Sequence, residues 1–243
     1  MMRAAFDRLS ALLALLLVLT SLWGLQSMRS GIDITYESVG RTPVIRYAAA
    51  DADGPVIVIA HGFAGSAQMM AYALSLAQAN YRVYAFDFEG HGRNPVPMSG
   101  DVTAIDGTTR LLVAQTLEVV AAVAETGQPV GVLGHSMATD VLVRAALQRP
   151  AQIGPLVLLS AVAGAVTAET PRDMVMIAGQ WEQRLRDFGL EAVRMIDPAA
   201  REGDLVRDGD VVRKAVSLPY IEHVSILHSQ VGQQAAIDWF NGA

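Results

Sequence analysis

Hydrophobic positions along the chain follow two spacings once a long apolar N-terminal run has ended. Short runs rich in β-branched residues are typical of buried strands. They occur at 55–62, 129–136, 155–162 and 173–180. Apolar residues at helical spacing occupy 66–80, 108–127, 137–150 and 182–196. Because strands that alternate with helices favour a parallel sheet covered on both faces, the pattern predicts an α/β fold.

Both ends of the domain depart from this alternation. Two strand-like segments, 32–40 and 42–50, predict an opening hairpin, and 81–90 predicts another strand. Near the other end, the Asp-Gly pair at 208–209 is a hairpin turn signal. The helical spacing of 225–240 predicts a closing helix.

The connection between the predicted strands at 155–162 and 173–180 is short. Only about ten residues separate them, and they leave room for neither a lid nor a full helix. Many α/β enzymes place one or the other at this point. We therefore expect one domain, 31–243, that is open on that side.

The N-terminal run, 9–25, is apolar throughout and follows two arginines. A membrane anchor needs about 17–25 apolar residues, whereas a signal peptide needs a small-residue cleavage site. Large residues such as Trp23 crowd the region where cleavage would occur. The pattern favours an uncleaved anchor in 1–30 over a signal peptide, with a soluble helix as the third interpretation. Either of the first two places 31–243 outside the cytoplasm, anchored, secreted or periplasmic.

Composition narrows the function classes. The chain has 243 residues, of which 52% are hydrophobic and 17% charged, so a large core is expected. A net charge of -6 without a basic run argues against a nucleic-acid partner. The absence of cysteine excludes a disulfide framework, a thiolate zinc site and a cysteine nucleophile. No nucleotide-binding or calcium-loop motif occurs, so we expect no cofactor and no metal.

One short stretch, "GHSMA" at 134–138, carries candidate chemistry. It lies between a predicted buried strand and a predicted helix, where a sharp turn can expose a serine nucleophile. Ala138 stands where the G-x-S-x-G pattern has glycine, a small-for-small exchange at a packing position. The alternative is that Ser136 only caps the helix.

A tetrahedral oxyanion needs two preorganised N–H donors. We expect one from Met137, which follows the serine, and the other from Phe63 in "HGFAG" (61–65), which follows the first buried strand. A glycine-containing turn that any α/β fold needs is the alternative for this loop.

Three motifs, "HGFAG", "DFEGHGRN" (87–94) and "GHSMA", occur in the order and at the spacing of the α/β-hydrolase-fold serine hydrolases. The chain resembles this family over nearly all of 31–243. The resemblance implies a mostly parallel central sheet with helices on both faces, here with little or no lid. It also implies hydrolysis of carboxylic esters through an acyl-enzyme. Glu89 and Asn94 replace the arginine and serine of the usual second motif, for which a structural role is implied.

Two histidines follow the serine in chain order and are candidate bases, His223 before the final predicted helix and His228 inside it. A loop position can reach above the sheet, so we expect His223. The family places the acid after the strand at 173–180, where Glu182 stands in place of the more usual aspartate. Asp187 is the alternative, and Glu222 is expected to point away.

Trp181 lies beside the predicted acid and is a candidate for the wall of an apolar substrate pocket. With no lid, the site is expected to accept bulky or polymeric esters. The rival functions are an acyltransferase, peptidase or lactonase with the same triad, and a non-catalytic binding protein with the same fold.

Overall fold

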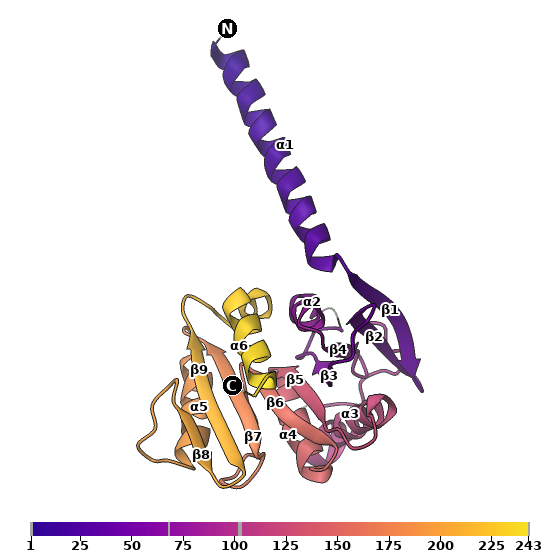
Figure 1. Cartoon of the computed structure of the whole chain (residues 1–243), viewed down its shortest axis with the longest axis vertical. Coiled ribbons are helices and arrows are strands. Elements are labelled where there is room, and N and C mark those ends of the chain that lie inside the picture. Colours follow the sequence, from indigo (N-terminus) through magenta and orange to yellow (C-terminus); the bar gives the residue numbers. More distant parts are fainter. Residues whose placement is uncertain (1, 68, 102–103, 243) are drawn as a thin grey trace.

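The central feature of the molecule is a nine-stranded sheet. The computed structural model describes residues 2–67, 69–101 and 104–242. The strands are β1 (Ile32–Val39), β2 (Thr42–Ala49), β3 (Val56–Ala60), β4 (Arg82–Phe86), β5 (Val130–His135), β6 (Ile153–Leu159), β7 (Asp173–Gly179), β8 (Leu205–Asp208) and β9 (Val211–Leu218). Their order is β1-β2-β4-β3-β5-β6-β7-β9-β8 (Figure 1).

Pairing within the sheet is parallel from β4 through β3, β5, β6 and β7 to β9. The β1, β2 and β8 strands extend its two ends through antiparallel pairs. The mostly parallel sheet predicted from the sequence is therefore confirmed. The carboxyl ends of the parallel strands lie along one edge, where α/β proteins place their ligands.

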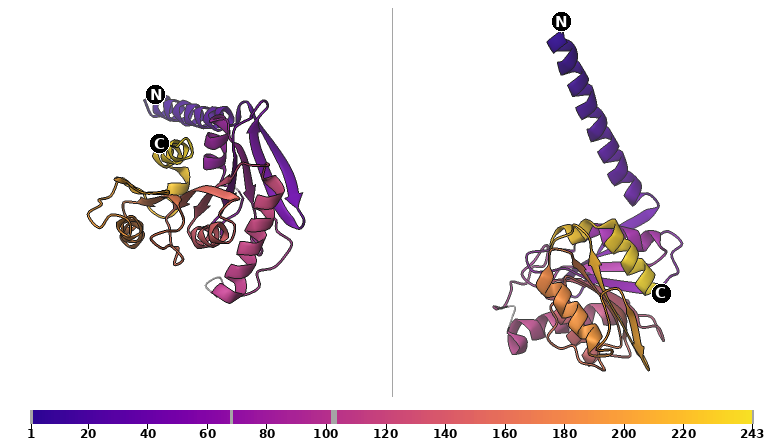
Figure 2. Two further views of the ribbon diagram at one scale, coloured as in Figure 1. Left: turned by 60° about the horizontal axis from the view of Figure 1, so that its bottom comes forward. Right: turned by 90° about the vertical axis from the view of Figure 1, so that its left-hand side faces the viewer.

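Helices cover both faces, as predicted. One face carries α2 (Met70–Gln78) and α6 (Gln230–Phe240), and the other carries α3 (Arg110–Val123), α4 (Met137–Gln148) and α5 (Gln183–Arg194) (Figures 1 and 2). The alternation of strand side chains produces this division. In β3, Val58 packs in the core shared with α3 and α4, and Ile57 and Ile59 pack in the core shared with α2 and α6.

Several helix ends differ from the predicted ones. The α2 helix begins at Met70, later than predicted, because the Ala67 amide donates to the Asp87 carboxylate and so Ala67 is held outside the helix. A π-type turn, η1 (Ile105–Thr109), precedes α3. The predicted closing helix is divided into a 3₁₀ turn, η2 (Ser225–His228), and α6. The Ser229 hydroxyl accepts the Gly232 amide at 3.1 Å and starts α6 as a new helix.

The connection from β6 to β7, residues 160–172, is described throughout and contains no helix. The prediction that no lid lies here is therefore confirmed. Arg213 of β9, which is fully buried, donates to the carbonyl oxygens of Thr167 and Pro171 in this connection and of Ala192 in α5. Burial lowers the pKa of Arg213 to about 10. The connection is thus fastened to the body of the domain.

A long helix, α1 (Met2–Arg29), projects from the domain and joins β1 through Ser30 and Gly31 alone (Figure 1; Figure 2, right). An 18-residue window within its segment Phe6–Arg29 has a mean hydropathy of 1.9, and none of that window is buried. Among the described residues this is one helix long and apolar enough to cross a membrane, a test that a signal sequence also passes. The Gln78 side chain of α2 donates to the Met28 carbonyl oxygen at 2.8 Å, which ties the helix to the domain.

Candidate active site

Ser136 occupies a sharp turn between β5 and α4. Its φ of 52° and ψ of -118° lie in a region that non-glycine residues rarely adopt and that is found at functional sites. The Ser136 amide donates to the Leu159 carbonyl oxygen at 3.0 Å, so β6 holds the turn in place. The Ser136 side chain makes no capping hydrogen bond to α4. The helix-cap interpretation of this serine therefore has no support in the geometry.

The residues around this turn are small because strand and helix pack closely. A Cβ built on Gly134 would lie 2.6 Å from the Leu142 side chain and 3.3 Å from the Ala138 methyl group. Ala138 is itself fully buried in the core between the sheet and α4. The core therefore accommodates the Ala138 methyl group at the position where the motif usually has glycine.

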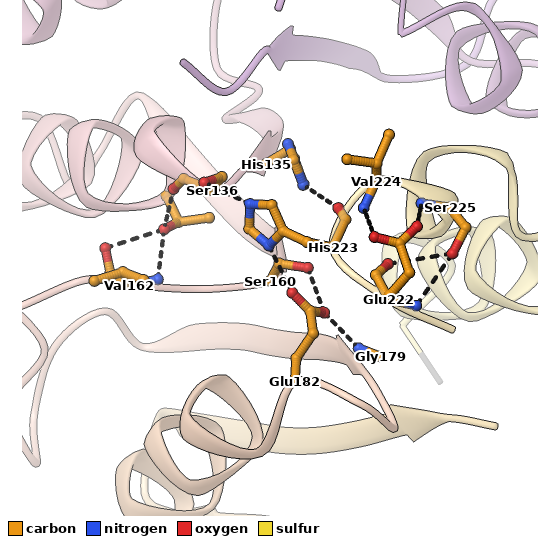
Figure 3. Close-up of polar contacts among 11 residues, drawn as sticks. His135, Ser136, Ser160, Val162, Gly179, Glu182, Glu222, His223, Val224 and Ser225 are labelled. Atoms are coloured by element: carbon orange, nitrogen blue, oxygen red, sulfur yellow. Dashed lines mark hydrogen bonds and ion pairs between the residues drawn. The ribbon is translucent and has the colours of Figure 1, made fainter. Parts of the chain in front are cut away.

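Three polar side chains from separate loops form a continuous hydrogen-bonded chain at the carboxyl ends of the strands (Figure 3). His223 Nε2 lies 3.0 Å from Ser136 Oγ, and His223 Nδ1 lies 2.6 Å from Glu182 Oε1. A carboxylate only accepts hydrogen bonds, so the network assigns the proton of the neutral imidazole to Nδ1. Nε2 is then free to accept the serine proton.

Glu182 is the buried end of this chain. Its side chain is only 6% exposed, against 43% for His223. Glu182 Oε2 accepts the Ser160 hydroxyl and the Gly179 amide, both at 2.7 Å. A Cβ on Gly179 would overlap the Ile221 carbonyl oxygen, so glycine lets the loop after β9 approach the end of β7. That approach brings His223 within reach of Glu182.

The alternative candidates lie elsewhere. Asp187 accepts a hydrogen bond from Gln183 on the outer side of α5. Glu222 accepts the amides of Val224 and Ser225, which lower the pKa of its carboxyl group and direct it away from the imidazole. His228 ends η2 and is exposed. The structure thus brings Ser136, His223 and Glu182 together and leaves Asp187, Glu222 and His228 outside the chain of hydrogen bonds.

The loop after β3 is fixed by buried side chains. His61 Nδ1 donates to the Gly62 carbonyl oxygen at 2.7 Å, and its Nε2 accepts the Phe88 amide at 3.1 Å. Burial lowers the pKa of His61 to about 4, so the ring stays neutral near pH 7. Phe63 stacks edge-on against His91 with ring centroids 5.6 Å apart. Among the described residues, neither the Phe63 amide nor the Met137 amide has a hydrogen-bond acceptor.

The loop after β4, which carries "DFEGHGRN", supports its neighbour. Asp87 is buried and accepts the amides of Ala67 and Arg93, which joins the two loops. Gly92 has a φ of +53°, and a Cβ there would overlap the Asp87 carboxylate. His91 bonds to the Glu89 carbonyl oxygen at 3.0 Å. These contacts are the structural role expected of this loop.

Two hollows are lined by members of the hydrogen-bonded chain. One, of about 350 Å³, is lined by Ser136 and His223 together with the loop after β3, the start of α2 and η2. The other, of about 880 Å³, lies between the β6–β7 connection and α5 and is lined by Glu182, Trp181 and Phe188. Trp181 is 65% exposed and belongs to this second hollow. Phe63, 62% exposed, lines the first.

Two neighbours of the hydrogen-bonded chain were missed by sequence reasoning. Ser160 contacts Glu182, and His135 Nε2 bonds to the His223 carbonyl oxygen at 2.9 Å. Burial lowers the pKa of His135 to about 4. Since a neutral imidazole that faces a carbonyl must donate, its proton lies on Nε2. The place of His135 directly before the serine was a signal, whereas nothing in the sequence marked Ser160.

No group of three histidine, aspartate or glutamate side chains in the described part of the chain is arranged to hold a metal ion. The site offers the Ser136 hydroxyl, the His223 imidazole and the Glu182 carboxylate in line. The amides of Phe63 and Met137, which have no acceptor among the described residues, belong to the neighbouring turns. This set of groups is suited to transfer of an acyl group through a serine.

The chain matches the family described as serine aminopeptidase, S33, over residues 52–232, and it belongs to this family. A dihydrolipoyllysine-residue acetyltransferase component of an acetoin cleaving system from Cupriavidus necator is 28% identical over 169 residues, which cover 65% of this chain and 42% of that protein. A putative carbamate hydrolase, RutD, from Escherichia coli O157:H7 (strain EC4115 / EHEC) is 30% identical over 109 residues, 45% of this chain and 38% of that protein. The chain spans about two fifths of the length of these relatives.

Solved structures share the fold. A predicted CIB-like hydrolase from Thermoplasma acidophilum superposes with a TM-score of 0.67 at 15% identity, over 88% of this chain and all of that one. The resemblance to the α/β-hydrolase-fold serine hydrolases is therefore confirmed, and the chain has this fold.

Proposed function

We propose that this member of the serine aminopeptidase S33 family hydrolyses carboxylic esters, with Ser136 as nucleophile, His223 as base and Glu182 as the acid that orients it. The observation that carries the proposal is the continuous chain from Ser136 Oγ to His223 Nε2 at 3.0 Å and from His223 Nδ1 to Glu182 Oε1 at 2.6 Å. The turn at Ser136 supports it by exposing the hydroxyl at the end of β5.

In the first half of the reaction, Ser136 Oγ bonds to the ester carbonyl carbon while its proton passes to His223 Nε2. The carbonyl electrons move to oxygen, and the amides of Phe63 and Met137 donate to this oxyanion. The intermediate then collapses, and the C–O bond to the alcohol breaks. The alkoxide takes the proton from His223, which leaves an acyl group on Ser136.

In the second half, water attacks the acyl carbon and gives its proton to His223 Nε2. Collapse of this intermediate releases the carboxylic acid and returns the proton to Ser136 Oγ. Glu182 stabilises the imidazolium in both halves without taking its proton. The reaction uses only groups of this chain and one water molecule.

The open edge of the domain supports bulky or polymeric esters as substrates. The β6–β7 connection contains no helix that could cover the site, and one hollow is lined by Ser136 and His223 while the other is lined by Glu182. Turnover of a short soluble ester and of a film of insoluble aliphatic polyester would be compared. Release of soluble product from the film supports this substrate class, and turnover confined to small acyl groups contradicts it.

A carbamate is the second candidate, because a relative is named as a putative carbamate hydrolase. The carbonyl of a carbamate can be attacked by the same groups. Rates on an ester and a carbamate with the same leaving alcohol would separate the two. Product analysis with added alcohol or amine would reveal acyl transfer, and peptide and lactone substrates would test the remaining rivals.

Covalent labelling tests the nucleophile and distinguishes the enzyme from a binding protein of the same fold. A fluorophosphonate probe should label the full chain and should fail to label Ser136→Ala. Ser38→Ala, which removes an exposed serine on β1, should label like the unaltered protein. Absence of labelling in the unaltered protein, or equal labelling of Ser136→Ala, would overturn the proposal.

The exposed, apolar α1 supports a further part of the proposal, that the domain is held at a membrane on its non-cytoplasmic side. The two-residue joint to β1 would keep the domain beside the bilayer. Carbonate extraction of membranes from cells that express the full chain should leave the protein in the pellet. Release into the supernatant at a mass that lacks α1 would favour a cleaved signal peptide.

A further inference from the structure

Ser160 has a backbone conformation that a serine rarely adopts. It follows the last residue of β6, is fully buried and has a φ of +50°. Its amide donates to the Ile177 carbonyl oxygen at 2.7 Å, which continues the pairing with β7. Glycine would adopt this φ at lower cost. A serine in this place indicates that the hydroxyl has a use that offsets the strain.

Glu182 needs an external partner to hold its orientation. It stands at the N-cap position of α5, yet its carboxylate makes no capping bond to that helix. The side chain turns back toward the end of β7 and has three rotatable bonds. Oε1 faces His223, and Oε2 is held by two donors, the amide of Gly179 at the end of β7 and the hydroxyl of Ser160 directly after β6. Two donors on one oxygen fix the plane of the carboxylate.

We infer that Ser160 is a positioning residue of the reaction: its hydroxyl holds Glu182 Oε2 so that Oε1 stays in line with His223 Nδ1. This inference rests on the proposed function and adds a fourth side chain to the three sequence candidates. The contact lies in the interior, where Ser160 is fully buried and the Glu182 side chain is 6% exposed. Water therefore cannot readily replace the lost donor.

The hydroxyl can be separated from the backbone strain by two substitutions. Ser160→Ala removes the oxygen and keeps a Cβ at φ +50°, whereas Ser160→Gly removes the oxygen and relaxes the strain. If the hydroxyl acts through Glu182, both variants lose turnover alike. If the residue only shapes the backbone, Ser160→Gly keeps the activity of the unaltered enzyme.

Steady-state kinetics on a soluble ester give the first readout. We expect both variants to lower kcat about 10- to 100-fold, as the loss of supporting partners does at other sites, with KM changed by less than about twofold because substrate binding is untouched. Thermal unfolding would be measured in parallel to show that both variants are folded. An unchanged kcat, or a rise in KM as the main effect, would overturn the inference.

A double-mutant cycle gives the second readout. Glu182→Gln removes the carboxylate, so Ser160→Ala should cost little more in that background. Asp187→Asn, which removes a nearby carboxylate outside the catalytic chain, is the matched background in which Ser160→Ala should keep its full effect. Additive losses with Glu182→Gln would contradict the inference. The downfield proton resonance of His223 Nδ1 should also shift or broaden in Ser160→Ala.

The failure of this inference and the failure of the proposed function are distinguishable. If the unaltered protein does not react with a fluorophosphonate, or if Ser136→Ala reacts equally, the proposed triad is wrong. If the unaltered protein reacts and Ser136→Ala does not, the triad stands, and a Ser160→Ala variant that reacts at the unaltered rate overturns the role of Ser160 alone.

Discussion

The two sides of Ser136 are built in different ways. On the side of the loop after β3, buried His61 and Asp87 bond to backbone amides and carbonyls, and they hold the loop that carries Phe63. On the opposite side, the contacts run between side chains, from Ser136 through His223 to Glu182, and the imidazole is 43% exposed.

The difference matches the two tasks that the proposed mechanism assigns to these two sides. An oxyanion site has to present amides at fixed positions, and buried contacts to the backbone keep it rigid. A base has to accept and return a proton twice in each cycle, so its ring must reach substrate and water. The comparison predicts that substitutions of His223 or Glu182 stop turnover. Loss of the buried contacts on the other side is expected to lower the stability of the fold first.

Removal of the base should produce the largest effect. His223→Ala should lower kcat about 10⁴-fold or more, because no other group among the described residues lies in line with Ser136 Oγ. His228→Ala is the matched control, since it removes an exposed histidine that lines the same hollow, and we expect it to keep most of the activity. Steady-state kinetics on a soluble ester measure both. Greater loss in His228→Ala would reverse the assignment of the base.

Acidification should weaken the fold through two buried histidines, His61 in the loop after β3 and His135 directly before Ser136. His61 and His135 have folded-state pKa values of about 4, below the ordinary 6.5. Between pH 6.5 and 4 the unfolded chain binds protons that the folded chain does not, so stability is lost as the pH falls through this window. Each group contributes about 3 kcal/mol when the window is crossed. Urea unfolding at pH 7, 6, 5 and 4 measures this loss.

Two variants test whether the loss of stability at low pH comes from the buried ring of His135. Folded His135→Gln should show a shallower dependence of the unfolding free energy on pH than the unaltered protein, since one depressed group is gone. His228→Gln, which removes an exposed ring, should retain the full dependence. If the unfolding free energy depends on pH equally in the two variants, the buried His135 ring does not contribute to the loss of stability at low pH.

The smallest expected effect is at the two aromatic side chains that line the hollows. Phe63→Ala keeps the backbone amide and should raise KM about 2- to 10-fold for esters of any size. Trp181→Ala should raise KM for bulky esters only, because its ring lines the hollow beside Glu182. KM values for a small and a bulky ester in both variants test this. If both substitutions raise KM equally for both esters, the two hollows do not have separate roles in binding small and bulky substrates.

Much of the fold could be predicted because the spacing of hydrophobic residues along the chain indicates the strands and helices and the faces that they bury. Val58 and its neighbours Ile57 and Ile59 alternate between two cores, which is the pattern of a strand buried on both faces. The later start of α2 could not be predicted, because the cause is a bond from Ala67 to Asp87, twenty positions away. Contacts of this kind depend on how two loops meet and leave no local pattern.

The candidate site also contains residues that local sequence motifs indicate and one residue that they do not. Ser136 and the loop with Phe63 were indicated by short motifs next to strands, and His223 by its place before the last helix. Ser160 was missed because its role depends on the pairing of β6 with β7, which brings it against a carboxylate 22 positions further along the chain. The assigned catalytic roles stay predictions until the variants are measured.

The close approach of the Ile221 carbonyl oxygen to Gly179 has a consequence for which substitutions this chain can accept. The separation of Glu182 and His223 depends on two stretches of backbone that meet at Gly179, a residue that lines neither of the two hollows. Any side chain at position 179 would push the loop after β9 outward and move the imidazole from its carboxylate. In a saturation screen, position 179 should therefore tolerate as few replacements as Ser136, and new substrate ranges should arise from the β6–β7 connection instead.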